Sequence, residues 1–344
     1  MGYGLAGRVF HAPFIEAVPG IELAAIVTTD AGRQADARAA HPGVVIVEGT
    51  AALWPAVADL GIDLVVVAAP NRAHAPVALA ALGAGLGVVV DKPFAATAAD
   101  GARVAAEAAG RGLFLSVFHN RRWDGDFLTV RRLVESGSLG DVWRFESRYE
   151  RWRPDRTLDS WKERADPQDA GGILADLGSH LIDQAIVLLG RPVSVDAELC
   201  RRRPGALVDD DSFVALNHAG GATSHLWASS TASRPGPRFR VLGSRAGYVA
   251  WGMDPQERDL RAGLLPRGAG WGEVPEPAWG TVGAGDAATP VPTEPGDYGR
   301  FYEGVVAALR HGASPPVDPA DAVATLEVID AARRSAALGR RVAV

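Results

Sequence analysis

The chain has a single cysteine, Cys200, and only two lysines, Lys92 and Lys162, among its 35 lysine and arginine residues. One cysteine excludes an internal disulfide framework and any metal site built from several cysteines. No apolar run approaches the roughly 18 residues of a membrane span, and no signal-peptide pattern opens the chain. The net charge of −6 includes no basic block, which argues against a nucleic-acid partner. We therefore expect a soluble, cytoplasmic protein that binds neither membrane nor nucleic acid.

The first 118 residues alternate short Val/Ile-rich runs with Ala-rich helical stretches. Near-continuous apolar strands joined by helices are typical of a parallel sheet that is buried on both faces. The predicted strands are Glu22–Thr28, Val44–Val47, Asp63–Ala69, Gly87–Val90 and Leu113–Phe118, and the predicted helices are Gly32–Ala40, Ala73–Ala84 and Ala98–Ala109. We predict an α/β, doubly wound domain over residues 1–118, whose ligand lies beyond the carboxyl ends of the strands.

A G-x-G-x-x-G pattern stands at the head of this series, in Gly2-Tyr3-Gly4-Leu5-Ala6-Gly7. Glycines in this pattern allow a tight turn and let the backbone approach a pyrophosphate, which then rests on a helix N-terminus. Because strands and helices follow in alternation, we predict a dinucleotide-binding Rossmann domain. The predicted contacts in this loop are Gly2, Gly4, Leu5, Ala6 and Gly7.

The strand that normally precedes such a loop is missing, because the chain begins inside the motif. In the usual strand order this strand is central, so its loss would open a gap in the sheet. Our hypothesis is a misassigned start, with roughly 6–10 residues missing upstream of Met1. An upstream in-frame stop codon adjoining Met1 would contradict it.

The choice between NAD and NADP should be set at the end of the second strand of such a domain. An acidic residue there binds the ribose hydroxyls of NAD and repels the 2′-phosphate of NADP. Here Thr28 occupies that position, while Asp30 resembles a helix N-cap. Thr28, Thr29 and Arg33 could receive a phosphate, so we predict NADP, with NAD as the alternative.

Two further segments follow predicted strands at the cofactor edge. In the first, Pro70-Asn71-Arg72-Ala73-His74, we expect Asn71 to cap a helix. His74 either faces the cofactor or lies on the helix surface. The second segment is Asp91-Lys92-Pro93, where the nicotinamide should lie. Lysine is a compact point charge that arginine does not replace in such a role. We predict that Pro70, Asn71, His74, Asp91 and Lys92 bind the cofactor.

The pattern changes after Phe118, where the predicted strands alternate apolar and polar residues. Alternation indicates a mostly antiparallel sheet with one face packed on helices. The predicted strands are Val142–Arg151, Val193–Arg201, Ser212–Asn217, Thr223–Ser229, Arg238–Leu242 and Tyr248–Trp251, and the predicted helices are Phe127–Ser136, Tyr298–Arg310 and Pro319–Leu338. We expect residues 262–297 to form a long irregular segment. We predict that residues 119–344 form an α+β domain with an open sheet.

An apolar stretch of this second half carries four polar residues, Asp176, His180, Asp183 and Gln184. Read as a helix, Asp176 and His180 stand at i and i+4 and share a face. One interpretation is a core Asp–His hydrogen bond that fixes the helix. A metal site is less favoured, because no obvious cluster supplies further ligands.

The other interpretation is acid–base catalysis. When hydride leaves an alcohol carbon, the hydroxyl proton must leave as well. A histidine oriented by a carboxylate suits that task, and Lys92 could stabilise the negative charge that develops on the oxygen. We therefore predict Lys92, Asp176 and His180 as catalytic residues and as substrate contacts.

These motifs resemble the glucose–fructose oxidoreductase/inositol dehydrogenase/rhizopine-catabolism (Gfo/Idh/MocA) family of NAD(P)-dependent oxidoreductases. The resemblance covers nearly the whole chain. It rests on the glycine motif, Pro70-Asn71, Asp91-Lys92-Pro93 and the pair Asp176 and His180. Phe10-His11-Ala12-Pro13, His119–Asp124 and Asp176–His180 look most like the NADP-dependent scyllo-inositol dehydrogenase branch. The family's usual glutamate before the lysine is Asp91 here, so the contact of this shorter side chain to the nicotinamide ribose is uncertain.

The resemblance implies a Rossmann domain followed by a substrate-binding and oligomerisation domain, whose open sheet commonly forms dimer or tetramer contacts. For the substrate pocket, the candidates are Arg122, Tyr149, Arg151, Trp152 and Arg153. Tyr149 and Trp152 could equally be ordinary sheet residues. We read Asp209-Asp210-Asp211 as a charged turn rather than a metal site, and Lys162 as solvated.

The sequence therefore predicts a dehydrogenase or reductase that acts on the secondary alcohol of a cyclitol or sugar and forms a homodimer or homotetramer. An enzyme of the same type that acts on another sugar ring is a second possibility. A dinucleotide-binding sensor without turnover is an alternative of a different class.

Overall fold

The computed structural model describes residues 1–155, 160–266 and 268–344. The chain divides into two compact units. The first comprises Met1–His119, Glu257–Ala269 and Tyr298–Ala322, and the second comprises Asn120–Gln256, Gly270–Asp297 and Val323–Val344. The chain first passes from one unit to the other after His119, and two later segments of the predicted second domain pack with the first unit. The predicted domains, 1–118 and 119–344, stay a prediction.

The first unit is built on parallel strands, as predicted. In the described part of the chain, β1 (Ala25–Val27) pairs with β2 (Val45–Val47), while β4 (Gly87–Asp91) lies between β3 (Leu64–Val67) and β5 (Leu115–Phe118). Every strand position is close to the predicted one, and the cores of β3 to β5 are Val- and Leu-rich. Such strands need cover on both faces.

The backbone of Met1 and Gly2 connects the two sets of strands. Gly2 N donates to Val27 O at 2.9 Å, beside β1. Ala68 N donates to Met1 O at 2.8 Å, and the Met1 amino group donates to Val66 O at 2.9 Å, both at β3. The glycine motif therefore lies between β1 and β3, in the central position that the Rossmann order assigns to it.

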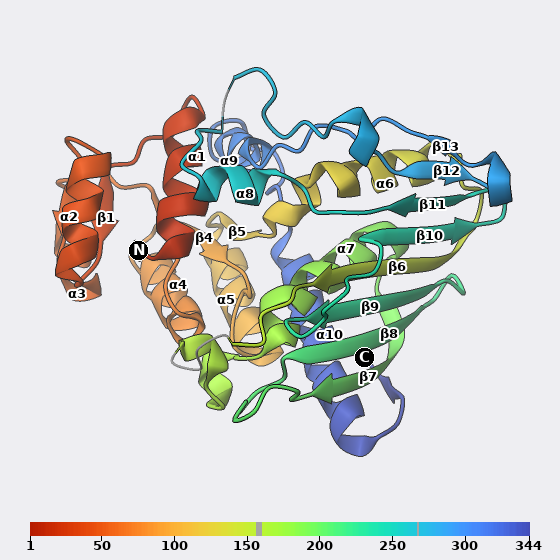
Figure 1. The fold of residues 1–344 in the computed structure, drawn as a ribbon. Coiled ribbons are helices and arrows are strands. Elements are labelled where there is room, and N and C mark those ends of the chain that lie inside the picture. The colour runs from red at the N-terminus through yellow and green to blue at the C-terminus, as the bar shows by residue number, and fades with distance from the viewer. Residues whose placement is uncertain (156–159, 267) are drawn as a thin grey trace. The chain divides into compact units, whose positions relative to one another are not determined.

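Helices of this unit alternate with its strands (Figure 1). Asp30 caps α2 through its Oδ1, which accepts Arg33 N at 2.8 Å, and Thr97 caps α5 through Asp100 N at 3.1 Å. Asn71 is not the cap that we expected, because it is the first residue of a 3₁₀ turn and α4 follows from His74. The helices are η1 (Ala6–His11), α1 (Ala12–Ala17), α2 (Ala31–Ala40), α3 (Thr50–Ala56), η2 (Asn71–Ala73), α4 (His74–Gly83), α5 (Ala98–Arg111), most of α8 (Gln256–Arg261) and α9 (Gly299–His311). We did not predict α3 or the π-helical form of η1.

A late segment of the chain completes this core. Phe301 of α9 packs edge-on against Phe118, with 4.9 Å between ring centroids. Tyr302 bonds through its hydroxyl to His11 Nδ1 at 2.6 Å. After α9, Val317 exchanges two hydrogen bonds with the Ser116 side chain, at 2.9 and 3.2 Å. Helix α9 is therefore an integral part of the first unit.

The second unit holds a large sheet. Its strand order among the described residues is β13-β12-β11-β10-β6-β9-β8-β7-β14, with only β6 and β9 parallel. The predicted mostly antiparallel sheet is therefore confirmed. The strands are β6 (Val142–Glu150), β7 (Pro192–Cys200), β8 (Asp211–His218), β9 (Thr223–Ser229), β10 (Phe239–Gly243), β11 (Gly247–Ala250), β12 (Thr281–Gly283), β13 (Thr289–Pro290) and β14 (Val342–Ala343). Strands β12 and β13 lie in the segment that we expected to be irregular.

One face of this sheet packs on helices, and the other is more open (Figure 1). On the covered face, Phe145, Val195 and Leu216 are fully buried. On the other face, the Arg148 guanidinium stacks over Trp227 at 3.8 Å, and Phe213 packs against the same indole at 5.1 Å between centroids. The helices of this unit include η3 (Asn120–Trp123), α6 (Gly125–Glu135), η4 (Trp161–Glu163), η5 (Pro167–Asp169), η6 (Leu174–Gly178), α7 (Ser179–Leu189) and much of α10 (Pro319–Leu338).

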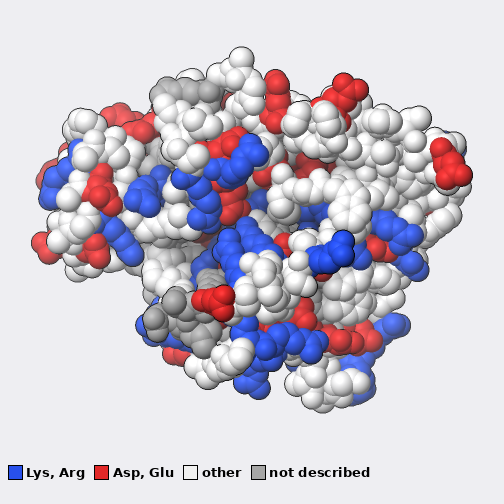
Figure 2. Space-filling model, viewed as in Figure 1, with Lys and Arg blue, Asp and Glu red and all other residues white. Residues whose placement is uncertain are grey.

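One helical stretch of the described residues, Pro167–Leu189, is long and apolar enough to cross a membrane, with a mean hydropathy of 1.4. We had expected no such stretch. Because 78% of it is buried inside the fold, it has the character of a core helix. On the surface, acidic and basic side chains are mixed across the face shown in Figure 2. That mixture agrees with the modest net charge of −6.

Candidate functional site

The glycine loop has the geometry that a pyrophosphate requires. Gly2 has a φ of +93°, which favours glycine, and a Cβ on Gly7 would overlap the carbonyl oxygen of Gly2. A Cβ on Gly4, in contrast, would meet nothing of the protein closer than Arg33, at 3.9 Å. Two glycines are therefore needed by the fold itself, whereas Gly4 leaves space beside the backbone. This space fits a dinucleotide phosphate, and Leu5 caps the following π-helix without a side-chain hydrogen bond.

The predicted cofactor-selecting residues lie next to this loop. Thr28 directly follows β1 and is 8% exposed, while Thr29 and Arg33 are exposed. The Arg33 guanidinium lies 3.9–4.0 Å from the Cβ position of Gly4. Asp30 is occupied as the cap of α2, as predicted. The residues after β1 therefore include an exposed hydroxyl group, on Thr29, and an exposed guanidinium, on Arg33 in the first turn of α2.

Lys92 lies just beyond β4, in a loop held by its neighbours. Asp91 Oδ1 accepts Lys92 N at 2.8 Å. The His74 ring lies between two carbonyl oxygens, with Nδ1 2.8 Å from Pro93 O and Nε2 2.9 Å from Ala69 O. Burial lowers the pKa of His74, which is only 1% exposed. The helix-surface alternative for His74 is therefore wrong, and the histidine joins the end of β3 to the Lys92 loop.

A second buried histidine supports the same loop from behind. His11 is 2% exposed, and its Nε2 lies 3.9 Å from Asp91 Oδ1. Burial lowers the pKa of His11 to about 4, so this ring is neutral at pH 7. The loop that carries Lys92 is thus held mainly by hydrogen bonds between side chains and nearby backbone groups.

In the second unit, Asp176 and His180 stand on either side of a change of helix type. Asp176 lies in the π-helical turn η6, and His180 is the second residue of α7. We predicted one regular helix, but a wider turn separates the two residues. Short π-helical segments occur mostly as single turns inside α-helices and are frequent at functional sites. His180 is 4% exposed, and the side chain of Asp176 is 20% exposed.

Lys162 is not the solvated residue that we expected. Its Nζ lies 2.6 Å from Asp176 Oδ1, within a salt bridge, and its side chain is 35% exposed. No spacing pattern in the sequence indicated this pair, because Lys162 lies in the short 3₁₀ turn η4, 14 residues before Asp176. Its rarity was the only available hint.

The turn that carries Asp176 is built on two glycines and an aspartate. Gly172 has a φ of +98°, and a Cβ there would overlap Asp209 Oδ1. Asp209 Oδ2 accepts Leu174 N at 2.7 Å. A Cβ on Gly171 would stand 2.8 Å from Lys162 O. The acidic run at 209–211 therefore has a structural role, in keeping with the charged turn that we read from the sequence. Among the described residues, no group of three or more His, Cys, Asp or Glu could hold a metal ion.

Helix α7 is held by buried polar contacts below His180. Arg122 donates two hydrogen bonds to the carboxylate of Asp183, from Nε to Oδ2 at 2.9 Å and from Nη2 to Oδ1 at 2.6 Å. Gln184 donates to Arg121 O at 2.8 Å and accepts from Arg238 at 3.1 Å. Arg122 therefore anchors α7, and its predicted contact with substrate stays a prediction.

The predicted contact of Tyr149 with substrate needs correction. It is 1% exposed, and its hydroxyl accepts hydrogen bonds from Arg121 and Arg151. The guanidinium groups of Arg121 and Arg151 each stand 4.7 Å from its ring centroid. Tyr149 is therefore the buried sheet residue of our alternative reading rather than a pocket residue. Trp152 is 58% exposed, and its substrate contact stays a prediction.

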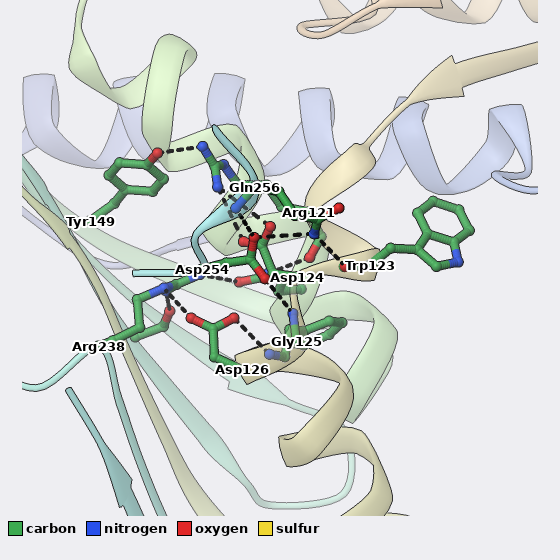
Figure 3. A network of polar contacts seen from close by, with 12 residues as sticks. Arg121, Trp123, Asp124, Gly125, Asp126, Tyr149, Arg238, Asp254 and Gln256 are labelled. Carbon is green, nitrogen blue, oxygen red and sulfur yellow. Dashed lines mark hydrogen bonds and ion pairs between the residues drawn. The ribbon is translucent and has the colours of Figure 1, made fainter. Parts of the chain in front are cut away.

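A buried acidic group lies at the start of α6 (Figure 3). Asp254 accepts Gly125 N at 2.8 Å and Gln256 N at 2.9 Å. Burial, followed by repulsion from Asp124 and Asp126, raises the pKa of Asp254 to about 8. This carboxyl group is therefore mostly protonated at pH 7. No pattern in the sequence had indicated this group.

Comparisons with known proteins bear on the whole chain. Residues 1–119 match an oxidoreductase family NAD-binding Rossmann fold, and residues 131–344 match the C-terminal alpha/beta domain of the same oxidoreductase family. The uncharacterized oxidoreductase YdgJ of Escherichia coli is 38% identical, over 98% of this chain and 95% of its own. The scyllo-inositol 2-dehydrogenase (NADP(+)) IolW of Bacillus subtilis is 34% identical, over 97% and 92%.

A solved structure agrees. That of YvaA from Bacillus subtilis superposes with a TM-score of 0.92 at 32% identity, over 100% of this chain and 96% of the other. The Rossmann fold, the glycine loop and the two matched family models thus agree on one assignment. The chain belongs to the Gfo/Idh/MocA family of oxidoreductases.

Proposed function

We propose that this protein is an NADP-dependent oxidoreductase that acts on the secondary alcohol or ketone of a cyclitol or sugar, of the scyllo-inositol kind. The observation that carries the proposal is the glycine loop with Arg33 beside the space at Gly4. The similarity to IolW, whose name specifies scyllo-inositol and NADP, supports the substrate class. A cytoplasmic location is part of the proposal.

In this proposal, the residues around the glycine loop hold the cofactor. Gly2, Gly4 and the backbone of Leu5, Ala6 and Gly7 receive the pyrophosphate at the start of η1. Arg33, with Thr28 and Thr29, binds the 2′-phosphate. Pro70, Asn71 and Asp91 line the nicotinamide side, and His74 holds that loop in place. When bound, NADP supplies the hydride acceptor or donor.

The chain's own residues supply the proton transfer and the charge stabilisation. During oxidation, His180 removes the hydroxyl proton as a general base, and Asp176 orients its imidazole. The ammonium group of Lys92 donates a hydrogen bond to the same oxygen and stabilises its developing negative charge. In reduction, His180 returns the proton to the oxygen. The anchoring of α7 by Arg122 and Asp183 keeps the histidine backbone fixed.

A test of this function is a spectrophotometric screen of inositols and aldoses with NADP and NAD. Turnover of a cyclitol or sugar, faster with NADP, is the expected result. Tight binding of cofactor without turnover across the panel would contradict the enzyme and favour the alternative, a dinucleotide-binding sensor on the same scaffold. Preference for NAD would contradict the role given to Arg33.

We also propose a homodimer or homotetramer, formed through the more open face of the large sheet. This face carries the Arg148, Phe213 and Trp227 cluster, and a cavity of about 280 Å³ lies beside it. Apolar rings on an open sheet face are typical of protein interfaces. Light scattering should give a dimer or tetramer mass, which a Trp227→Glu substitution should lower. A wild-type monomer would contradict the proposal.

A further inference from the structure

We propose that Lys162 is a positioning residue of the reaction, which fixes the Asp176 carboxylate in orientation and in charge. The inference rests on the proposed function, because Asp176 is there the residue that orients His180. A second lysine in this role has no counterpart in the motifs that identified the site. Its support comes from the contact itself and from the way the chain holds it.

The contact joins the one lysine without an assigned role to the carboxylate of the proposed site. Lys162 Nζ and Asp176 Oδ1 are 2.6 Å apart, a short charge-assisted hydrogen bond. An ammonium at this distance favours the ionised form of a carboxylate. Ion pairs between fully exposed side chains contribute little, but these side chains are only 35% and 20% exposed. The pair can therefore hold one carboxylate oxygen in a fixed direction.

The backbone around Lys162 is tied to the turn that carries Asp176. Gly172 N donates to Lys162 O at 3.0 Å, and Asp176 N donates to Gly172 O at 3.1 Å. Gly171 permits close contact, since a Cβ would stand 2.6 Å from Arg164 O. Two backbone hydrogen bonds thus lead from Lys162 to Asp176. Lys162 and Asp176 therefore belong to one local hydrogen-bonded structure.

The residue next to Lys162 anchors this segment in the interior. Glu163 is 5% exposed and accepts from Arg203 Nη2 at 2.8 Å. Arg203 also donates from Nε to Asp210 Oδ2 at 2.9 Å. Burying three charges is costly unless they are paired, and here they are paired. A lysine that only improved solubility would not need a buried anchor beside it.

The space beside the pair suits lysine. A cavity of about 10 Å³, close to the volume that one water needs, is lined by Lys162, Asp176, Arg203, Asp209 and others. A guanidinium is planar and wider than an ammonium group. In a chain with 35 basic residues, of which two are lysines, this small space gives a physical reason for lysine at 162.

The activity test compares three variants with the wild-type enzyme. Lys162→Met should lower kcat by about 10- to 100-fold, because misplacing one group of a site has effects of that order. Its NADP dissociation constant and melting temperature should stay near wild type. Lys162→Arg keeps the charge but brings a wider guanidinium into the small space beside the pair, so it should recover only part of the loss. The control is Arg164→Met, which removes an exposed charge from the same segment and should leave turnover unchanged.

A turnover of Lys162→Met within twofold of wild type would overturn the proposal. So would an equal loss in Lys162→Met and Lys162→Arg, since the charge would then be irrelevant. If Lys162→Met fails to fold, the comparison of Lys162→Arg with the wild type and the spectroscopic test below still decide the question.

A second test needs no substrate. With only two lysines, a chain labelled with [ε-¹³C]lysine gives two lysine side-chain signals, and Lys162→Arg assigns them. Asp176→Asn should shift the Lys162 signal. An unmoved signal would overturn the pair whether or not a substrate is known. If the signal moves but the wild-type protein turns over no polyol or sugar, the proposed function fails, and with it the role in the reaction, while the pair stands.

Discussion

The two lysines of the chain are held in different ways. Lys92 follows the end of a parallel strand, and its loop is fixed by hydrogen bonds between nearby backbone groups and the side chains of Asp91 and His74. Lys162 lies in the short 3₁₀ turn η4, and its surroundings are fixed by the buried charges of Glu163, Arg203 and Asp210. Regular secondary structure places the first lysine, whereas paired charges from distant parts of the sequence place the second. The two regions should therefore respond differently to substitution.

The largest effect should follow from Lys92→Met. We expect turnover to fall by about 10³-fold, equivalent to about 4 kcal/mol of activation free energy, because a donor to the developing oxyanion is lost. Cofactor affinity should change little, as measured by fluorescence titration with NADPH. A turnover near the wild-type rate would mean that the proposed mechanism is wrong. Lys92 would then contribute no more to the reaction than Lys162 does.

Removing the anchor of the second lysine should affect stability. Arg203→Met leaves Glu163 and Asp210 buried without this partner, so we expect a loss of about 3 kcal/mol in the free energy of unfolding by urea. The matched control is Arg202→Met, since the Arg202 side chain of the Arg202–Asp211 pair is exposed and its loss should change the free energy of unfolding much less. Equal effects of the two substitutions would remove the contrast between buried and surface charges.

The pH dependence of stability should also differ between the two regions. In the first unit, the pKa of His11 is lowered to about 4, so its unfolded form binds the proton first and stability falls as the pH drops below about 6.5. In the second unit, the pKa of Asp254 is raised to about 8, so the folded form keeps the proton up to a higher pH than the unfolded form does. The contribution of Asp254 therefore falls as the pH rises toward 8.

Asp254→Asn tests this sign. Relative to this variant, the wild-type protein should lose about 1.4 kcal/mol of unfolding free energy per pH unit between about pH 5 and pH 7, with a smaller slope as the pH approaches 8. Using the difference cancels the groups that titrate alike in both proteins, including His11. Asp286→Asn, at an exposed position, should keep the wild-type dependence. Parallel curves for wild type and Asp254→Asn would show that Asp254 is ionised in the folded protein.

The smallest effect concerns the cofactor. Arg33→Ala should raise the KM for NADP by about tenfold, the value of roughly 1.4 kcal/mol for one charge-assisted contact, and should leave the KM for NAD nearly unchanged. Steady-state kinetics with both cofactors would measure it. The exposed Arg38, on the same helix, provides the control substitution to alanine. An equal change for both cofactors would place Arg33 away from the 2′-phosphate.

The first unit could be predicted largely from the sequence, because its signals are local. The glycine motif, the Val-rich strands and the cap at Asp30 each lie within a few residues. The sequence could not decide between the two interpretations of His74, because both of its partners are backbone carbonyls, which leave no trace in a residue pattern. The packing of α9 with the first unit was not predicted for a similar reason, since its periodicity shows an apolar face but not what that face contacts.

The second unit could be predicted only in part. Strand alternation gave the sheet and the spacing gave Asp176 and His180. The π-turn and the Lys162 contact depend on residues far apart in sequence, such as Gly172 with Asp209. Tyr149 shows the limit of residue type as evidence, because an aromatic ring that could pack on a sugar packs instead under two arginines.

The return of α9 to the first unit has a consequence for biosynthesis. Phe118 acquires its partner Phe301 about 180 residues later, and His11 acquires its partner Tyr302 291 residues later. Until then, the nascent Rossmann half exposes part of its core, at a stage when N-terminal domains normally fold first. The ribosome-bound chain therefore carries an apolar surface through most of its synthesis. Attachment of α9 is the step that closes this surface.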